Sequence, residues 1–121
     1  MRLQLKNFYH DRRSYVVRVA INGDFLMTTH ALAMITITDR ELLGAYREKA
    51  PAALARHGGA LVTVDPEPIV LEAAGDAPNI AALLSFPDTD AAKAWINDPD
   101  LADVHALRNE GGRSTIVVIP N

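Results

Sequence analysis

The chain has 121 residues, 49% of them hydrophobic, which is enough for a single domain with one core and no disulfide or metal crosslinks. It has no cysteine, which excludes disulfides, thiol nucleophiles and Cys-ligated metal centres, and its formal net charge of −3 argues against nucleic acid as a partner. Charged residues interrupt every apolar run, so we predict neither a membrane span nor an export signal, and we expect a cytoplasmic protein.

The first quarter of the chain differs in charge from the rest. Residues 1–30 carry a local net charge of +3, whereas residues 31–121 carry −6. We interpret 1–26 as an N-terminal extension, either a disordered arm or a stretch upstream of the true start at Met27. The codons possible for the residues before Met27 include a purine-rich stretch that resembles a bacterial ribosome-binding site. The alternative is an extra strand at 14–21 that pairs with a sheet edge. The domain itself is predicted to span 27–121.

The first core element after Met27 is a predicted strand at 31–38, where side chains alternate between two faces. Asp39 then offers an N-cap, and apolar residues recur at three- and four-residue steps up to His57, as on one face of a helix. Pro51 falls inside this helix and is expected to kink or split it. Gly58 and Gly59 are predicted to end the helix.

Three further apolar runs follow. Residues 60–65 are predicted to form a strand, and 68–73 to continue it or pair with it after two prolines. Residues 80–86 are apolar almost without a break, which predicts a central strand buried on both faces.

The last third of the chain is predicted to contain a helix beginning near Asp88, a short helix over 99–109 and a closing strand at 114–120. The order strand, helix, strand, strand, helix, strand is that of a ferredoxin-like βαββαβ α+β sandwich with an antiparallel sheet. Its helices cover one face of the sheet only. We therefore expect the other face to be covered by a second copy of the chain, because large exposed apolar patches are rare on monomers.

Several phrases together resemble a known family. They are "MITITD", "AYREKAPAALARHGGALV", "VLE", "LLSFPDTDAAKAWINDPD" and "ALR", and they are similar to the family called domain of unknown function thirteen-thirty over residues 31 to about 119. The resemblance implies a dimeric α+β barrel in which two sheets pack face to face. It implies no activity, since related barrels include monooxygenases, isomerases and haem-degrading enzymes.

Two candidate site residues lie on the predicted long helix. Tyr46 is on its apolar face, where the phenol either points into a cleft between helix and sheet or packs in the core. His57, at the helix end, is a candidate acid, base or ligand contact, but interaction with the helix dipole explains it more simply.

Two more candidates lie near the C-terminus. Trp95 is predicted to pack the second helix onto the sheet and to form a pocket wall at most. Arg108 lies one helical turn after His105, and the pair is a candidate site for an anionic substrate. The simpler alternative is that Arg108 pairs with Asp98 or Asp103 at the surface.

No histidine spacing typical of a metal site occurs, and no phosphate-binding loop or Ser-His-Asp pattern is present. We therefore expect neither a metal nor a cofactor. Two hypotheses stay open. The chain either binds or transforms a small anionic or aromatic molecule between sheet and helices, through Tyr46, His57, Trp95 and Arg108, or it is a non-enzymatic homodimeric interaction module. A pocket of several hundred Å³ with convergent polar groups favours the first hypothesis, and a filled interior favours the second.

Overall fold

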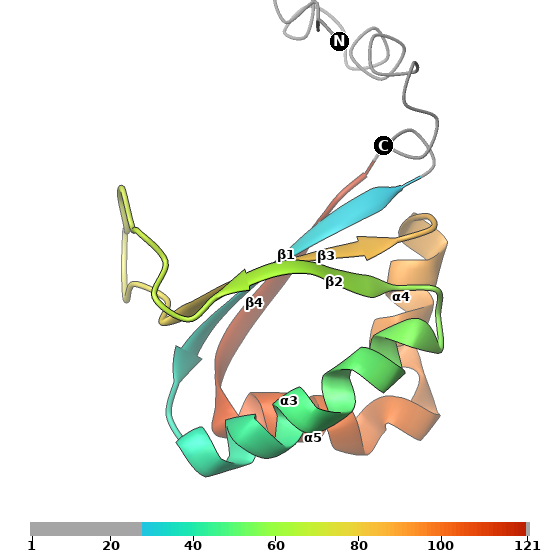
Figure 1. Cartoon of the computed structure of the whole chain (residues 1–121), viewed down its shortest axis with the longest axis horizontal. Helices are drawn as coiled ribbons and strands as arrows, with labels where there is room; N and C mark the ends of the chain where they lie inside the picture. The colour runs from blue at the N-terminus through green and yellow to red at the C-terminus, as the bar shows by residue number, and fades with distance from the viewer. Residues whose placement is uncertain (1–27, 121) are drawn as a thin grey trace, which may run out of the picture.

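The computed structural model describes residues 28–120. The predicted extension at 1–26 and the alternative strand at 14–21 lie outside the described residues. The elements follow the order β1 (Thr29–Ile37), α3 (Arg40–Ala55), β2 (Ala60–Asp65), β3 (Ile80–Phe86), α4 (Thr89–Asn97), the 3-10 turn η2 (Pro99–Leu101), α5 (Ala102–Gly111) and β4 (Gly112–Ile119) (Figure 1).

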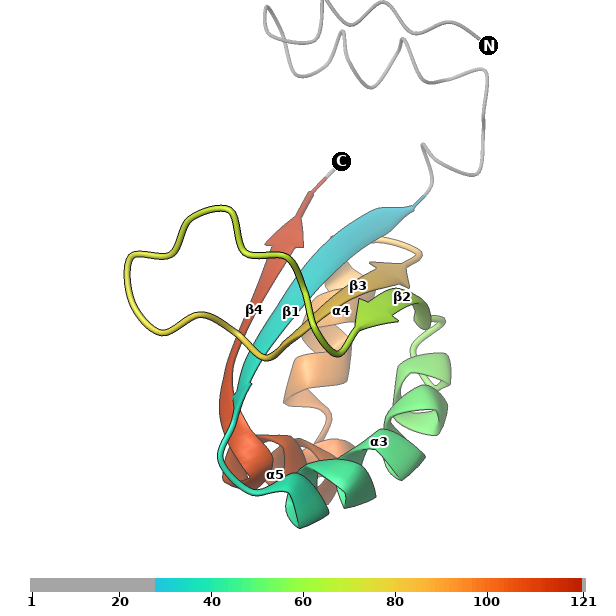
Figure 2. The ribbon, with the colours of Figure 1, turned by 60° about the vertical axis from the view of Figure 1, so that its left-hand side comes forward.

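The four described strands form one antiparallel sheet in the order β2-β3-β1-β4. All the described helices lie on one side of it, as Figures 1 and 2 show from two directions. This arrangement confirms the predicted ferredoxin-like α+β fold. Strand β3 is central as predicted. Within one chain, however, the helices cover only one of its faces. The burial of the side chains shows this, since Ile80, Leu84 and Phe86 are buried whereas Leu83 is partly exposed.

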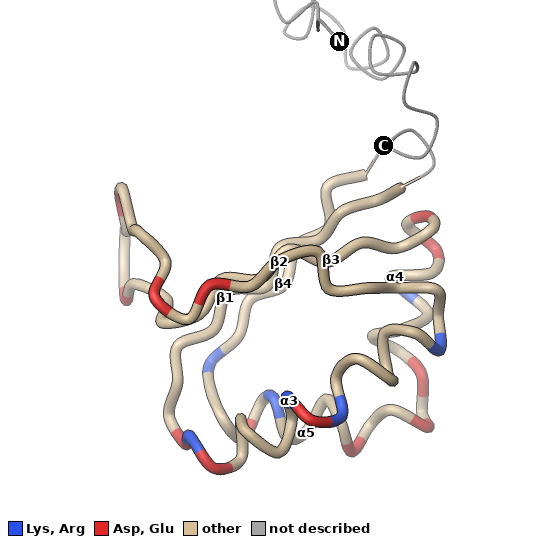
Figure 3. Tube along the Cα trace, viewed as in Figure 1, with Lys and Arg blue, Asp and Glu red and all other residues tan. Residues whose placement is uncertain are grey.

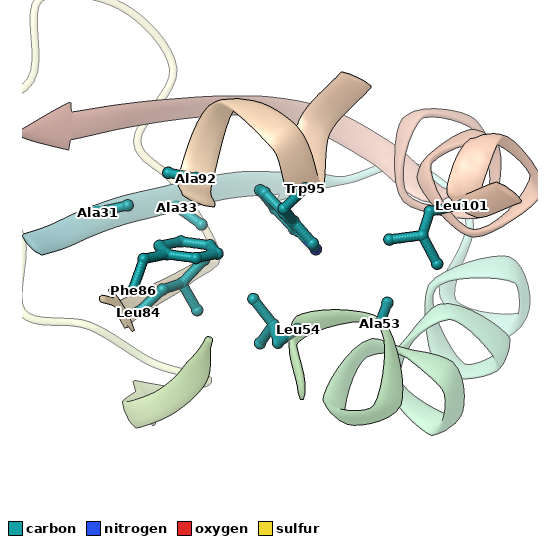
Figure 4. Close-up of a cluster of buried hydrophobic side chains, with 9 residues drawn as sticks. All are labelled: Ala31, Ala33, Ala53, Leu54, Leu84, Phe86, Ala92, Trp95 and Leu101. Atoms are coloured by element: carbon teal, nitrogen blue, oxygen red, sulfur yellow. The ribbon is translucent and has the colours of Figure 1, made fainter. Parts of the chain in front are cut away.

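The core lies between the sheet and the helices (Figure 4). Alternate residues of β1 are buried, which places Ala31 and Ala33 against the helices. Phe86 from β3 and Trp95 from α4 meet in this layer, with ring centroids 5.4 Å apart. Strand side chains alternate between the two faces of the sheet, so every second one forms one wall of the core, and helix side chains form the other.

Helix α3 begins where the sequence predicts. The Asp39 side chain accepts hydrogen bonds from the backbone N–H groups of Glu41 and Leu42, which otherwise have no partner in the helix. Of the two outcomes predicted at Pro51, a kink or a split, the split does not occur, since α3 continues through it to Ala55. After α3, Gly58 adopts a φ of 72°, a conformation that glycine takes without a steric penalty.

Helices α3 and α5 approach closely at Gly111. A Cβ atom at this position would lie 2.7 Å from the backbone nitrogen of Leu43. The Gly111 carbonyl also accepts hydrogen bonds from the N–H groups of Thr38 and Asp39, so it fixes the segment that leads into α3. The missing side chain at Gly111 therefore sets how near the two helices lie, and with it the position of α3 above the sheet.

The segment between β2 and β3 is a long loop that projects beyond the sheet and away from α3 and α5 (Figures 1 and 2). The prediction of a strand at 68–73 is wrong. Pro66 and Pro68 lack the N–H groups that a strand needs, and the chain leaves the sheet after β2 although the outer edge of β2 is unpaired among the described strands. Consequently Ile69 and Leu71 are 89% and 95% exposed.

Candidate functional site

An interior pocket lies between α3 and the helix-facing side of the sheet. Its volume is about 260 Å³. The residues that line it come from α3, from three strands and from the start of the β2–β3 loop: Ala33, Ile35, Leu43, Tyr46, Arg47, Ala50, Pro51, Leu54, Leu61, Val64, Pro66, Ile80, Ala82 and Leu84. Apolar side chains dominate this set, which is the usual character of a small-molecule site.

The polar groups of the pocket come from two consecutive residues of α3, Tyr46 and Arg47. Both follow Leu43 by one helical turn, so the spacing brings all three toward the sheet. Tyr46 is half-buried, whereas Arg47 is exposed and stands at the rim. Tyr46 was a candidate from the sequence and Arg47 was not. Its position one turn after Leu43 on an apolar helix face was the available signal.

Arg108 lies behind Tyr46 and is not among the residues that line the pocket. Its side chain is buried, with 3% of its surface exposed. The guanidinium carbon Cζ lies 5.5 Å from the Tyr46 ring centroid and 5.6 Å from the Trp95 ring centroid, so both aromatic rings face the cation. No described carboxylate pairs with it, and Nε has no hydrogen-bond partner. The expected surface pair with Asp98 or Asp103 is not formed.

The polar partner of Arg108 is His105, as their spacing predicts. Arg108 Nη1 lies 2.8 Å from His105 Nδ1, and His105 Nε2 lies 2.9 Å from the carbonyl oxygen of Trp95. A guanidinium can only donate, so Nδ1 accepts and the ring is the neutral tautomer with its proton on Nε2. Burial lowers the pKa of His105 below its usual 6.5, and the nearby charge of Arg108 lowers it further.

His57 stands away from the pocket, where α3 meets the turn after α4. Its Nε2 atom lies 2.8 Å from Oδ2 of Asp98, which also accepts from Nε of Arg56 at 2.9 Å. The hydrogen bond with His57 lowers the pKa of the Asp98 carboxyl below its usual 3.8. No sequence pattern points to this carboxylate, which is 41 residues from His57. The arrangement joins the end of α3 to the turn after α4.

Trp95 is buried at the centre of the helix layer and does not line the pocket. Its ring meets the edge of His105 at a centroid distance of 4.9 Å, besides its contact with Phe86. Of the four predicted site residues, Tyr46 and Trp95 therefore lie beside the buried guanidinium of Arg108. The fourth residue, His57, lies away from these three.

Within residues 28–120, no group of three His, Asp or Glu side chains is arranged to hold a metal ion. None of the described helices combines the length and apolar character needed to cross a membrane.

The fold and the pocket define a ferredoxin-like α+β domain with a small apolar interior site. A family model for a domain of unknown function (DUF1330) matches residues 28–121, and the chain belongs to this family. None of the curated proteins compared with the chain matches it significantly.

Solved structures show the same fold at low sequence identity. RPA0582, a protein of unknown function from Rhodopseudomonas palustris, is 17% identical with a TM-score of 0.63, over 78% of this chain and 82% of that one. SnoaB, a cofactor-independent oxygenase from Streptomyces nogalater, is 13% identical with a TM-score of 0.56, over 78% and 92%. A dimeric ferredoxin-like protein of unknown function from Jannaschia sp. CCS1 is 16% identical with a TM-score of 0.54, over 78% and 99%.

Proposed function

We propose that this protein is a homodimer that binds a small, mainly apolar molecule in the pocket between α3 and the sheet. The observation that carries the proposal is the pocket of about 260 Å³ with apolar walls and with Tyr46 and Arg47 as its polar groups. An apolar cavity of about 150 Å³ holds benzene, so this one has room for a bicyclic aromatic molecule. A non-enzymatic interaction module has no need of such a space. The oxygenase among the structural neighbours shares the fold with this chain.

Filling the pocket tests the proposal. Two bicyclic probes, 2-naphthoate and naphthalene-2-carboxamide, are titrated by calorimetry against the wild type and an Ala50→Leu variant. Ala50 lines the pocket, so the added methyl groups occupy the space of the ligand. We expect binding of the preferred probe to weaken by about tenfold or more.

The matched control is Ala55→Leu, the same substitution at the exposed last residue of α3 and outside the pocket. It is expected to bind as the wild type does. If neither probe binds the wild type, or if both variants bind equally well, the pocket is not the site.

We further propose that dimerisation occurs through the sheet face opposite the helices. Leu83, Leu32 and Val117 are paired across β3, β1 and β4, and all three point away from the core. Charged residues lie mostly on helices and loops rather than on this sheet (Figure 3). Ile69 and Leu71 of the projecting loop add further exposed apolar surface. Surface of this kind is typical of an interface.

A charge on the open face is expected to dissociate the dimer. Val117→Asp places an unpaired carboxylate in the proposed interface, which should raise the dimer dissociation constant at least about tenfold. Ile96→Asp is the control, because Ile96 is on α4 and both residues are 41% exposed. Sedimentation equilibrium measures both constants. Equal constants for the two variants, or a monomeric wild type, would exclude this interface.

A further inference from the structure

Among residues 28–120, one charged side chain lines the pocket, and it is positive. This side chain is Arg47, and the described part of the lining contains no Asp or Glu. Arg47 forms no ion pair with any described carboxylate, so its guanidinium is available at the rim.

A second cation lies behind the pocket wall. The guanidinium carbon of Arg108 is 5.5 Å from the ring centroid of Tyr46, which itself lines the pocket. Arg108 is buried, its hydrogen-bond partner His105 is a neutral ring, and no described acid compensates its charge. The potential from an uncompensated charge among apolar side chains is weakly screened. Arg47 at the rim and Arg108 behind the wall therefore both favour an anion in the pocket, although its walls are apolar.

We propose that the ligand is an apolar carboxylic acid, bound as its carboxylate. This proposal rests on the proposed function and adds the chemical class of the molecule. The carboxylate lies at the rim, where the planar guanidinium of Arg47 donates two parallel hydrogen bonds to it. The apolar body, of roughly bicyclic size, fills the interior against Ile35, Leu54 and Ile80. Arg108 acts through the Tyr46 ring, and its field favours the anion without contacting it.

The test compares two probes that differ in charge and little in shape, 2-naphthoate and naphthalene-2-carboxamide. Calorimetric titrations are made with the full-length wild type and with Arg47→Met, which keeps an unbranched apolar stem and removes the charged guanidinium. The wild type is expected to bind the carboxylate about tenfold more tightly than the amide, and Arg47→Met to lose most of this preference and keep only the part due to Arg108. Arg47→Lys, which keeps the charge without the planar fork, should restore part of the preference.

Arg40→Met provides the matched control, because Arg40 is exposed on the same helix and does not line the pocket. It should keep the wild-type preference. If the wild type binds both probes equally within the pocket, the ligand class is wrong while the proposed function stands. A preference that is undiminished in Arg47→Met overturns the role of Arg47. If neither probe binds, the proposed function and this inference both fail.

Discussion

Trp95→Ala is expected to lower the free energy of unfolding by about 3–5 kcal/mol, the largest effect of any substitution considered. Trp95 is 3% exposed, and its ring contacts Phe86 and His105 from two sides. Removing it leaves a cavity between α4 and the sheet, and it also takes away one of the two aromatic rings that face Arg108. A urea titration followed by circular dichroism measures the change.

Ile96→Ala is the control for this prediction, since it lies next to Trp95 on α4 but is partly exposed. Exposed substitutions usually change stability by less than about 0.5 kcal/mol. Similar losses in the two variants would mean that Trp95 is not the centre of this layer.

His105→Leu is expected to cost about 1.5–3 kcal/mol, the worth of a hydrogen bond to a charged group. The substitution removes the only acceptor described for the buried guanidinium of Arg108 and the donor to the Trp95 carbonyl. His105→Gln is the informative comparison, because an amide can both accept from Arg108 and donate to the carbonyl. It should recover much of the loss in the same urea titration. Equal losses in Leu and Gln variants would contradict the hydrogen-bond arrangement.

The same pair also predicts a pH dependence. Burial lowers the pKa of His105 in the folded chain below the value of 6.5 expected when unfolded. Below pH 6.5 the unfolded chain therefore binds more protons at this residue, and acid favours unfolding. The stability due to neutral His105 is complete above pH 6.5 and declines as the pH falls from there toward the folded pKa. Ionised Asp98 also contributes to the stability of the folded chain, because its pKa is lowered there. This contribution is lost only as the pH falls below 3.8, the usual pKa of an aspartate.

Stability curves at several pH values measure this effect. The stability advantage of the wild type over His105→Gln should shrink as the pH is lowered from 7 to about 5, because glutamine does not titrate. A constant difference would contradict a neutral buried His105.

Local signals predicted most of the fold. The alternation in β1 and the cap at Asp39 depend on neighbouring residues only, and both are where the sequence indicates. The segment 68–73 has a composition suited to a strand and forms none, although the outer edge of β2 is unpaired among the described strands. Whether a segment pairs with an edge depends on the loop and the sheet as a whole and cannot be read from six residues.

The site was less predictable for the same reason. Tyr46 and the pair His105–Arg108 follow from helical spacing. The carboxylate partner of His57 is far away in sequence, and nothing periodic connects the two. In the sequence, Arg47 looks like an ordinary solvent-exposed arginine. Its place at the pocket depends on strands and a β2–β3 loop residue that are distant in sequence.

The most direct test of the proposed pocket is an amide ¹H–¹⁵N NMR titration of the full-length chain with 2-naphthoate. If the molecule binds between α3 and the sheet, the largest shifts fall on the lining residues, such as Tyr46, Leu54 and Ile80, and saturate with one ligand per chain. Shifts confined to the open sheet face or to the β2–β3 loop, or no saturable shifts, would contradict an interior binding site.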